Sequence, residues 1–287
     1  MKYLQLIRVH QWIKNLFIFL PVFFGGVITD LVMLSHVLAG FLAFSMTASV
    51  IYIINDYLDI EQDKIHPTKS KRPLAAGTVK TSHAFLIASV LFVAGLAIGY
   101  TQNISFLYIQ LIYFTMNLLY SKYLKKIPLV DICIIAIGFL LRVFAGSALS
   151  GIILSKWLVV MTFLLALFLA LAKRRDDVLL SQNQQLEVRK AIKGYNLEFI
   201  NAAMVMMASV IIVAYLMYSF SPEVNKRLHH DMAYLPVFWL IIGLLRYFQL
   251  TFVEQQSADP TKILLKDKMT LSVVLCWLMT NFILIYY

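Results

Sequence analysis

The amino-acid sequence predicts an all-α, polytopic membrane protein with about nine transmembrane helices around a central cavity. Of its 287 residues, 61% are hydrophobic and only 14% are charged, whereas about 25% are charged in an average soluble domain. Apolar stretches of about 18–20 residues recur along the chain, each long enough to cross roughly 30 Å of hydrocarbon. Lys and Arg gather in alternate connections between these stretches. We therefore expect a single transmembrane domain over residues 1–287.

The predicted spans follow one another with short connections on one side and longer ones on the other. They are centred on residues 14–33, 35–56, 83–100, 104–121, 129–150, 155–173, 199–219, 233–251 and 269–287. The first stretch is long and has no small-residue cleavage site, so a cleavable signal peptide is not expected.

Positive charge fixes the expected orientation, because cytoplasmic loops of membrane proteins are enriched in Lys and Arg. With the N-terminus inside, 20 of the 25 Lys and Arg residues fall in inside segments and three in outside loops. The inside residues are Lys2, Arg8, Lys14, Lys64, Lys69, Lys71, Arg72, Lys80, Lys122, Lys125, Lys126, Lys173, Arg174, Arg175, Arg189, Lys190, Lys193, Lys262, Lys266 and Lys268; the outside ones are Lys156, Lys226 and Arg227. We expect a multi-pass protein of the cell membrane, with a cytoplasmic N-terminus and an outer C-terminus.

The net charge of +10 follows from this topology and does not indicate nucleic-acid binding. Anionic lipid headgroups and phosphorylated substrates are the expected partners. Cys133 and Cys276 lie in apolar spans without metal-ligand spacing, so we interpret them as packing residues.

A block of acidic and then basic residues, residues 55–77, follows the second span. On a helix, Asn55, Asp56, Asp59 and Asp63 fall within an arc of about 100°, whereas Glu61 points away. Carboxylates on one stripe repel each other unless cations lie between them. Hard oxygen ligands suit Mg²⁺, which prefers one or two carboxylates together with the phosphate oxygens of a substrate. The block predicts a metal–diphosphate site on the cytoplasmic face, with Asp56, Asp59 and Asp63 as its catalytic residues.

Two prolines, Pro67 and Pro73, predict that this helix ends near Ile65. His66, Lys69 and Arg72 would then fold back over the metal site, where Lys and Arg can hold phosphate oxygens. The alternative interpretation is a solvated helix end, stabilised by the nearby lysines alone.

A second charged cluster, Lys173-Arg174-Arg175-Asp176-Asp177, follows the sixth span. It predicts the other wall of an anionic pocket, which Tyr195 could close. The alternatives are a positive-inside anchor for the cluster and an interfacial aromatic for Tyr195.

Further cations are candidate substrate-binding residues. Arg142 lies inside the fifth span, where an unpaired Arg costs at least about 2.5–3.5 kcal/mol, so it should face the protein interior or a wet cavity. Its alternative role is structural pairing, with Asp131 as one partner. Lys14 and Asn15 begin the first span and could reach a headgroup phosphate. Lys122, Lys125 and Lys126 form a similar rim, of which Lys122 is the predicted site residue; membrane anchoring is the alternative for each.

Known catalytic motifs of other kinds are missing from the sequence. The six His residues show no zinc spacing, and neither a Gly-x-x-x-x-Gly-Lys phosphate loop nor a Ser-centred nucleophile elbow is present.

The pattern Asn55-Asp56-x-x-Asp59-x-x-x-Asp63 at the cytoplasmic end of a second span resembles the UbiA-type intramembrane prenyltransferase superfamily. The resemblance implies a diphosphate substrate held through Mg²⁺ by two aspartate-rich motifs, in a cavity between helices that opens to the cytoplasmic side and to lipid. One departure is visible: the second motif reads Lys173-Arg174-Arg175-Asp176-Asp177, with Leu180 and Ser181 where a partner Asp would fall.

This departure, with the segments Arg8-x-His10-Gln11-Trp12-x-Lys14-Asn15, His66-Pro67-x-Lys69 and Leu141-Arg142-x-x-Ala145-Gly146, is similar to the decaprenyl-phosphate phosphoribosyltransferase branch. That resemblance implies transfer of 5-phosphoribose from 5-phosphoribosyl 1-diphosphate to a polyprenyl phosphate, with release of diphosphate, for cell-wall biosynthesis. Two anionic substrates require extra cations, which Lys173 and Arg174 could supply.

Two other functions stay open at this point. A member of the same superfamily could move a prenyl group from prenyl diphosphate to an aromatic or lipid acceptor, which also requires the first metal site. A transporter of an anionic metabolite would need polar residues through the depth of several spans, whereas the charges here gather on one face.

Overall fold

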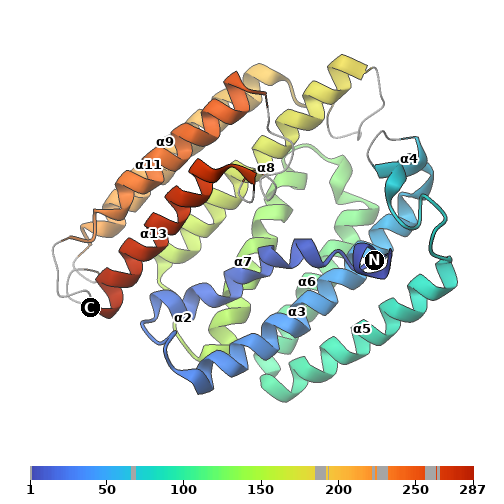
Figure 1. Cartoon of the computed structure of the whole chain (residues 1–287), viewed down its shortest axis with the longest axis horizontal. Helices are drawn as coiled ribbons and strands as arrows, with labels where there is room; N and C mark the ends of the chain where they lie inside the picture. Colours follow the sequence, from blue (N-terminus) through green and yellow to red (C-terminus); the bar gives the residue numbers. More distant parts are fainter. Residues whose placement is uncertain are drawn as a thin grey trace. The chain divides into compact units, whose positions relative to one another are not determined.

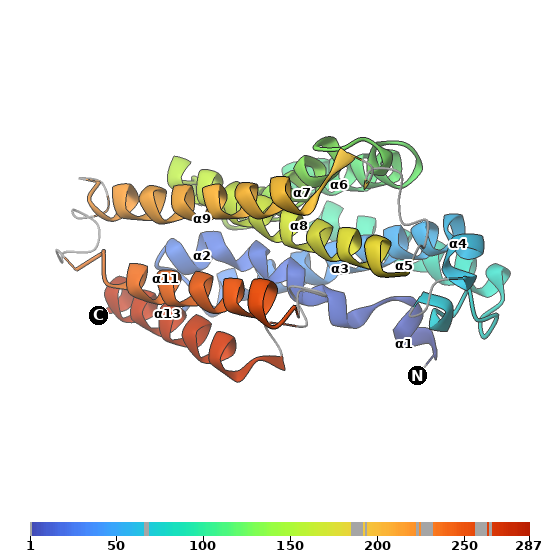
Figure 2. The same cartoon turned by 90° about the horizontal axis from the view of Figure 1, so that it is seen from above.

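The computed structural model describes residues 2–65, 69–184, 192, 194–221, 224, 232–255, 263 and 266–287. Every element in these ranges is a helix (Figures 1 and 2). The chain forms two compact units: unit 1 comprises Met1–Lys125 and Leu141–Leu154, and unit 2 comprises Lys126–Leu140 and Ser155–Tyr287.

Unit 1 is built around the long helix α3. Its elements, in chain order, are α1 (Lys2–Leu6), the 3₁₀ helix η1 (Val9–Phe19), α2 (Leu20–Phe24), α3 (Leu31–Leu58), α4 (Ile60–Lys64), η2 (Lys69–Lys71), α5 (Thr81–Gln102), α6 (Ile104–Lys122), the start of η3 (Leu124–Lys126) and the second half of α7 (Val130–Ser150). Helix α3 packs against α5, α6 and η1. Phe44 and Phe106 are fully buried between these helices.

Unit 2 contains the first half of α7, then α8 (Lys156–Gln184), α9 (Leu197–Ser219), α11 (Pro236–Phe248) with a π-helical turn η5 (Gln249–Val253), and α13 (Lys268–Tyr286). Helix α8 packs against α9, and α11 packs against α13. Phe168, Ile200 and Met204 lie in the core of this unit.

Four of the long helices begin at a polar side chain that caps them. Asp30 accepts hydrogen bonds from the Val32 and Met33 amides, at 2.9 and 3.1 Å, at the start of α3. Asn103, Asn196 and Asp267 cap α6, α9 and α13 in the same way. Such caps satisfy amides that have no partner within the helix, so the helix starts follow directly from the sequence.

Eight of the described helices are long and apolar enough to cross a membrane, and the prediction of an all-α polytopic protein is confirmed. The first predicted span, residues 14–33, differs: the apolar helix runs over Val9–Phe24 and is shorter than a typical span. Gly25 and Gly26 follow it, and Gly26 has a φ of 74°. Because this left-handed backbone cannot continue a helix, the chain turns before Asp30 starts α3.

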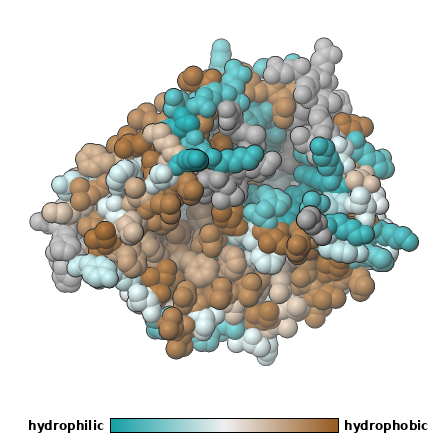
Figure 3. All heavy atoms as spheres, in the orientation of Figure 1, coloured by the Kyte–Doolittle hydropathy of each residue, from teal (hydrophilic) through white to brown (hydrophobic). Residues whose placement is uncertain are grey.

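Large apolar side chains lie on the surface of both units, and they cover much of the face shown in Figure 3. Leu31 is 77% exposed and Val93 is 67% exposed, although both lie on candidate spans. A soluble protein rarely leaves so many such side chains in water, whereas a bilayer accepts them. The outer faces of these helices are therefore consistent with contact with lipid.

Candidate active site

The predicted aspartate stripe lies where α3 passes into α4. Helix α3 ends at Leu58 and α4 begins at Ile60, with Asp59 between them at φ −103° and ψ 6°. The backbone hydrogen bonds nevertheless continue across this point, because the Asp59 amide donates to the Asn55 carbonyl at 3.0 Å and the Asp63 amide to the Asp59 carbonyl at 2.8 Å. Helix α4 ends at Lys64, so the predicted end near Ile65 is confirmed.

Asp56 and Asp63 converge on one guanidinium group. Arg72 Nη1 lies 3.1 Å from Asp56 Oδ1 and 2.6 Å from Asp63 Oδ2. Both carboxylates are buried, at 2% and 3% exposure. Two carboxylates that share a single cationic nitrogen define a position that favours a cation strongly.

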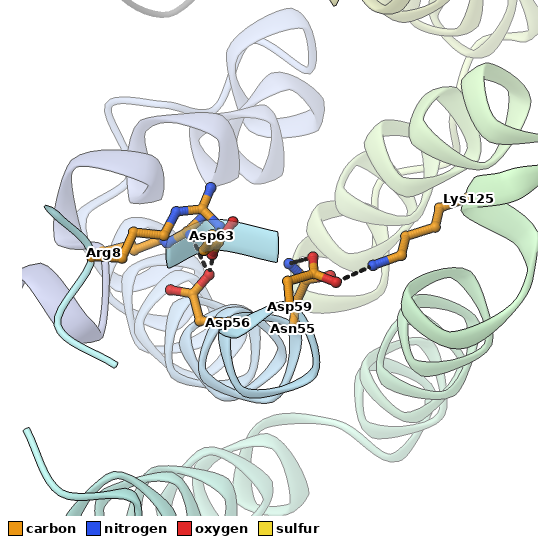
Figure 4. A network of polar contacts seen from close by, with 7 residues as sticks. Arg8, Asn55, Asp56, Asp59, Asp63 and Lys125 are labelled. Carbon is orange, nitrogen blue, oxygen red and sulfur yellow. Dashed lines mark hydrogen bonds and ion pairs between the residues drawn. The ribbon is translucent and has the colours of Figure 1, made fainter. Parts of the chain in front are cut away.

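Arg8 reaches the same carboxylate, Asp56, from the N-terminal segment (Figure 4). Its guanidinium also lies over the Tyr52 ring, 5.0 Å from the ring centre. Arg8 has a φ of 52° and a ψ of 50°, a left-handed conformation that is uncommon for a residue other than glycine. Burial lowers the pKa of Arg8, and the neighbouring Asp56 opposes that effect.

The rest of the N-terminal segment is fixed to α3. Leu6 is fully buried, Ser49 Oγ donates to the Ile7 carbonyl at 2.8 Å, and Trp12 Nε1 donates to Ser49 Oγ at 3.0 Å. These contacts hold the backbone on both sides of Arg8. Arg8 was not among the predicted site residues, and only its place in the Arg8-to-Asn15 segment could have indicated it.

Asp59 lies in a second group, apart from Asp56 and Asp63 (Figure 4). Lys125 Nζ is 2.6 Å from Asp59 Oδ1, and Asn55 Nδ2 donates to Asp59 Oδ2 at 3.2 Å. The structure thus divides the predicted stripe into Asp56 with Asp63 and Asn55 with Asp59. Lys125 was named only as part of a basic rim and was not chosen as a site residue. The residue chosen from that rim, Lys122, is exposed, with its ammonium over the Tyr123 ring.

Two further predicted residues, Asn15 and Arg142, meet in the interior of unit 1. Arg142 Nε donates to Asn15 Oδ1 at 2.7 Å, and Arg142 Nη2 donates to the Tyr113 hydroxyl at 2.8 Å. Asn15 in turn donates to Ser45 Oγ at 2.9 Å. Arg142 therefore faces the protein interior, as its position in a span requires.

The second charged cluster is described within unit 2. Arg174 is fully buried and pairs with Asp177 and with Asp131, where its Nε is 2.7 Å from Asp131 Oδ2. Its Nε and Nη2 atoms make no aligned hydrogen bond within the described part of the chain, so the contact with Asp131 is an ion pair by distance. Tyr195 donates to Asp131 Oδ1 at 2.7 Å and accepts from the Leu129 amide at 2.7 Å. Burial is the main cause that raises the pKa of Tyr195.

The remaining predicted residues are placed as follows. Lys14 and Lys69 are half-buried in unit 1, and Lys173 is half-buried in unit 2. His66 lies outside the described residues. That Lys173, Arg174 and Tyr195 form one wall of a pocket stays a prediction.

The donor set fits a magnesium ion. Within the described ranges, no three or more His, Cys, Asp or Glu side chains are already gathered as a metal site. However, Asp56 and Asp63 converge on one cationic atom, and Asn55 and Asp59 add oxygen donors one turn apart. Magnesium needs only one or two protein carboxylates when phosphate oxygens complete its shell.

These features define a class of protein: a polytopic helical membrane protein with a buried group of carboxylates and cations at the end of one long span. The model of the UbiA prenyltransferase family matches residues 18–269. The chain belongs to that family, whose name supports a transferase activity.

Curated relatives match over nearly the full chain. A decaprenyl-phosphate phosphoribosyltransferase of Mycolicibacterium smegmatis is 31% identical over 294 residues, covering 99% of this chain and 92% of the relative. The protein of the same name from Mycobacterium tuberculosis is 30% identical and covers 96% and 91%. The resemblance to this branch that the sequence indicated is confirmed.

A solved structure shares the fold. A UbiA homolog from Archaeoglobus fulgidus, bound to DMAPP and Mg²⁺, has a TM-score of 0.75, 19% identity and coverage of 99% of both chains. At this identity the likeness supports the fold alone.

Proposed function

We propose that this protein transfers 5-phosphoribose from 5-phosphoribosyl 1-diphosphate to a polyprenyl phosphate, such as decaprenyl phosphate, and releases diphosphate in an Mg²⁺-dependent reaction. The observation that carries the proposal is the convergence of Asp56 and Asp63 on a single cation, in a chain whose full-length relatives bear this activity in their names. The bond between the anomeric carbon and the diphosphate breaks, and a bond from that carbon to a phosphate oxygen of the lipid forms.

Asp56, Asp59 and Asp63, with Asn55, would hold Mg²⁺ together with the donor's diphosphate. The bound ion would neutralise charge on the leaving diphosphate. The lipid phosphate is already anionic, so no strong general base is required of the protein. This agrees with the described surroundings of Asp56 and Asp63, where the partners are arginines and not histidine.

The cations of the chain would bind the phosphate groups. We assign this role first to Arg72, because its guanidinium lies at the two carboxylates and could turn to a bidentate contact with phosphate. The proposed substrate-binding residues are Lys14, Asn15, His66, Lys69, Arg72, Lys122, Arg142, Lys173, Arg174 and Tyr195. Four of these are buried and would contact substrate only from the protein interior: Asn15, Arg142, Arg174 and Tyr195.

The positive-inside bias supports a place in the cell membrane with the N-terminus and active site cytoplasmic and the C-terminus outside. The product would serve cell-wall biosynthesis.

A second candidate is the transfer of a prenyl group from a prenyl diphosphate to an aromatic or lipid acceptor. It is favoured by the shared fold with the Archaeoglobus fulgidus homolog, which was solved with DMAPP and Mg²⁺. The two candidates share the diphosphate and the metal and differ in the group that is transferred.

A transfer assay separates them. Purified protein receives Mg²⁺, polyprenyl phosphate and radiolabelled phosphoribosyl diphosphate, and the label is counted in the organic phase. A parallel reaction contains labelled prenyl diphosphate with an aromatic acceptor. We expect label in lipid only in the first reaction, and none when Mg²⁺ is removed with EDTA. Label only in the second reaction would replace our proposal with the prenyl-transfer candidate.

A further inference from the structure

The carboxylates of the candidate site are matched by the protein's own cations. Asp56 pairs with Arg8 and Arg72, Asp63 pairs with Arg72, and Asp59 pairs with Lys125. Among the residues of unit 1 that the structure describes, three carboxylates therefore pair with three cations. The nearby Glu61 is exposed and pairs with Lys64, so it adds no charge to the group.

This balance affects a divalent cation and a diphosphate differently. A metal ion that arrives alone must displace Arg8 or Arg72 from Asp56, and the group then carries an excess positive charge. A diphosphate that arrives alone meets guanidinium groups whose charge is already satisfied by carboxylates. When both arrive together, the metal takes the carboxylates and the displaced guanidinium groups take phosphate oxygens, so every charge keeps a partner.

We propose that Arg8 and Arg72 make the site bind the metal and the diphosphate synergistically, so that each ligand binds weakly without the other. This inference rests on the proposed function, because it concerns the same diphosphate site. It assigns to Arg8 a role beyond stabilisation of the N-terminal segment: Arg8 exchanges a carboxylate partner for a phosphate partner.

The geometry of Arg8 supports this exchange. Its backbone is held in the left-handed region between two fixed points, the Ile7 carbonyl on Ser49 and the Trp12 indole on Ser49. The guanidinium stands on the face of Tyr52, which would remain its support after Asp56 is released. Only the side chain has to move.

The test measures the two ligands separately in detergent-solubilised protein. Mn²⁺ binding is followed by EPR of the free ion, with and without inorganic diphosphate, and each signal is compared with that of the same solution without protein because diphosphate also binds Mn²⁺ in water. Binding of radiolabelled diphosphate is measured by equilibrium dialysis, with and without Mn²⁺. For the unmodified protein, we expect each ligand to increase the affinity for the other by roughly tenfold or more.

The variant Arg8→Met should move the two affinities in opposite directions. Without this cation, Asp56 gains free charge, so Mn²⁺ alone should bind several-fold more tightly; diphosphate in the presence of Mn²⁺ should bind roughly tenfold more weakly. Arg72→Met should change the two affinities in the same directions. Because Arg72 lies in a different segment, this variant tests the proposal even if Arg8→Met folds poorly. Arg8→Lys keeps the charge and should restore weak binding of Mn²⁺ alone. Lys2→Met removes an exposed charge from the same segment and should change neither affinity.

If Arg8 had only a structural role, Arg8→Met would bind both Mn²⁺ and diphosphate more weakly. That result would overturn the proposal. Equal Mn²⁺ affinity with and without diphosphate in the unmodified protein would overturn it as well. Synergistic binding without transfer of phosphoribose would contradict the proposed function but not this inference. Transfer of phosphoribose without synergistic binding would contradict this inference but not the proposed function.

Discussion

Lys125 Nζ lies 2.6 Å from Asp59 Oδ1, and both side chains are largely buried. Asp59 lies between α3 and α4, and Lys125 belongs to the 3₁₀ turn η3, 66 residues later in the chain. The loop after α6 is thus connected to the carboxylate group by a charge-assisted hydrogen bond.

Replacement of Lys125 should impair the proposed transfer. Lys125→Met leaves the Asp59 carboxylate without its cation, so that Asp59 is poorly positioned and the site more negative. We expect a loss of at least about tenfold in the rate of lipid labelling because Asp59 is a proposed metal ligand, together with a lower melting temperature because the carboxylate is left without its cation. Lys126→Met is the matched control, because Lys126 is the exposed neighbour. Equal rates in the two variants would contradict the role of Lys125.

The carboxylates should matter individually and without loss of the fold. Asp59→Asn and Asp63→Asn each keep the shape of the side chain and remove the charge that Mg²⁺ requires. We expect lipid labelling to fall by roughly a hundredfold or more, and a moderate fall in melting temperature because each substitution also breaks an ion pair, with Lys125 or with Arg72. Glu61→Gln, on the exposed side of α4, is the control and should retain activity. Full turnover in Asp59→Asn and Asp63→Asn would remove the metal site from the proposal.

Arg142 and Asn15 should be coupled in stability. Loss of either leaves the other buried with an unsatisfied group, at a cost of about 1–3 kcal/mol. Arg142→Met and Asn15→Ala should each lower the melting temperature in detergent, measured by circular dichroism. The double variant should lose less than the two single effects together, because the contact can be lost only once. If the loss of stability in the double variant equalled the sum of the two single losses, the 2.7 Å contact would contribute nothing to stability.

The start of α13 should depend on pH only under acidic conditions. Arg246 Nη2 lies 2.7 Å from Asp267 Oδ1, and hydrogen bonding from Arg246 is the main cause that lowers the pKa of Asp267. Since the pKa is lower in the folded state, the stabilisation is fully present above the ordinary value of about 3.9 and is lost as the pH falls through the folded value.

Asp267→Asn should therefore lower the melting temperature by a constant amount between pH 5 and pH 8. The difference from the unmodified protein should shrink below about pH 4. Lys266→Met, an exposed neighbour, serves as the control. A difference that grew on acidification would contradict the lowered pKa.

The aspartate stripe could be predicted from periodicity alone, because helical hydrogen bonds persist on both sides of Asp59. Its division into two groups follows from the same periodicity, because at about 100° per residue Asn55 and Asp59 lie at one end of the arc and Asp63 and Asp56 at the other. The cations that each end meets could not be predicted in this way, because Arg8, Arg72 and Lys125 reach the carboxylates from other segments of the chain.

Arg8 and Lys125 were missed for a related reason. Both reach the carboxylates from segments that are not regular α-helices: Arg8 has a left-handed backbone, and Lys125 lies in a 3₁₀ turn. The 100° rule places side chains only on continuous α-helices. Lys122, the nearby residue that was chosen instead, lies in the last turn of α6 and is exposed.

The first span also shows what a hydropathy count omits. The apolar run over residues 14–33 is continuous in composition, yet Gly25, Gly26 and the cap at Asp30 divide it. The conformations of Gly25 and Gly26 and the cap at Asp30 therefore decide where the first helix ends, although the surrounding residues are mostly apolar.

Arg142 and Asn15 are also held together by shape. A methyl group added at Gly146, one turn after Arg142, would lie 1.9 Å from the main-chain oxygen of Ile18. Because that oxygen belongs to the backbone and cannot rotate away, α7 and η1 touch at a point where any side chain would force them apart. A single added carbon at Gly146 would separate Arg142 from Asn15 without altering a charge or a hydrogen-bonding group, so this buried polar contact depends on a residue that has no side chain at all.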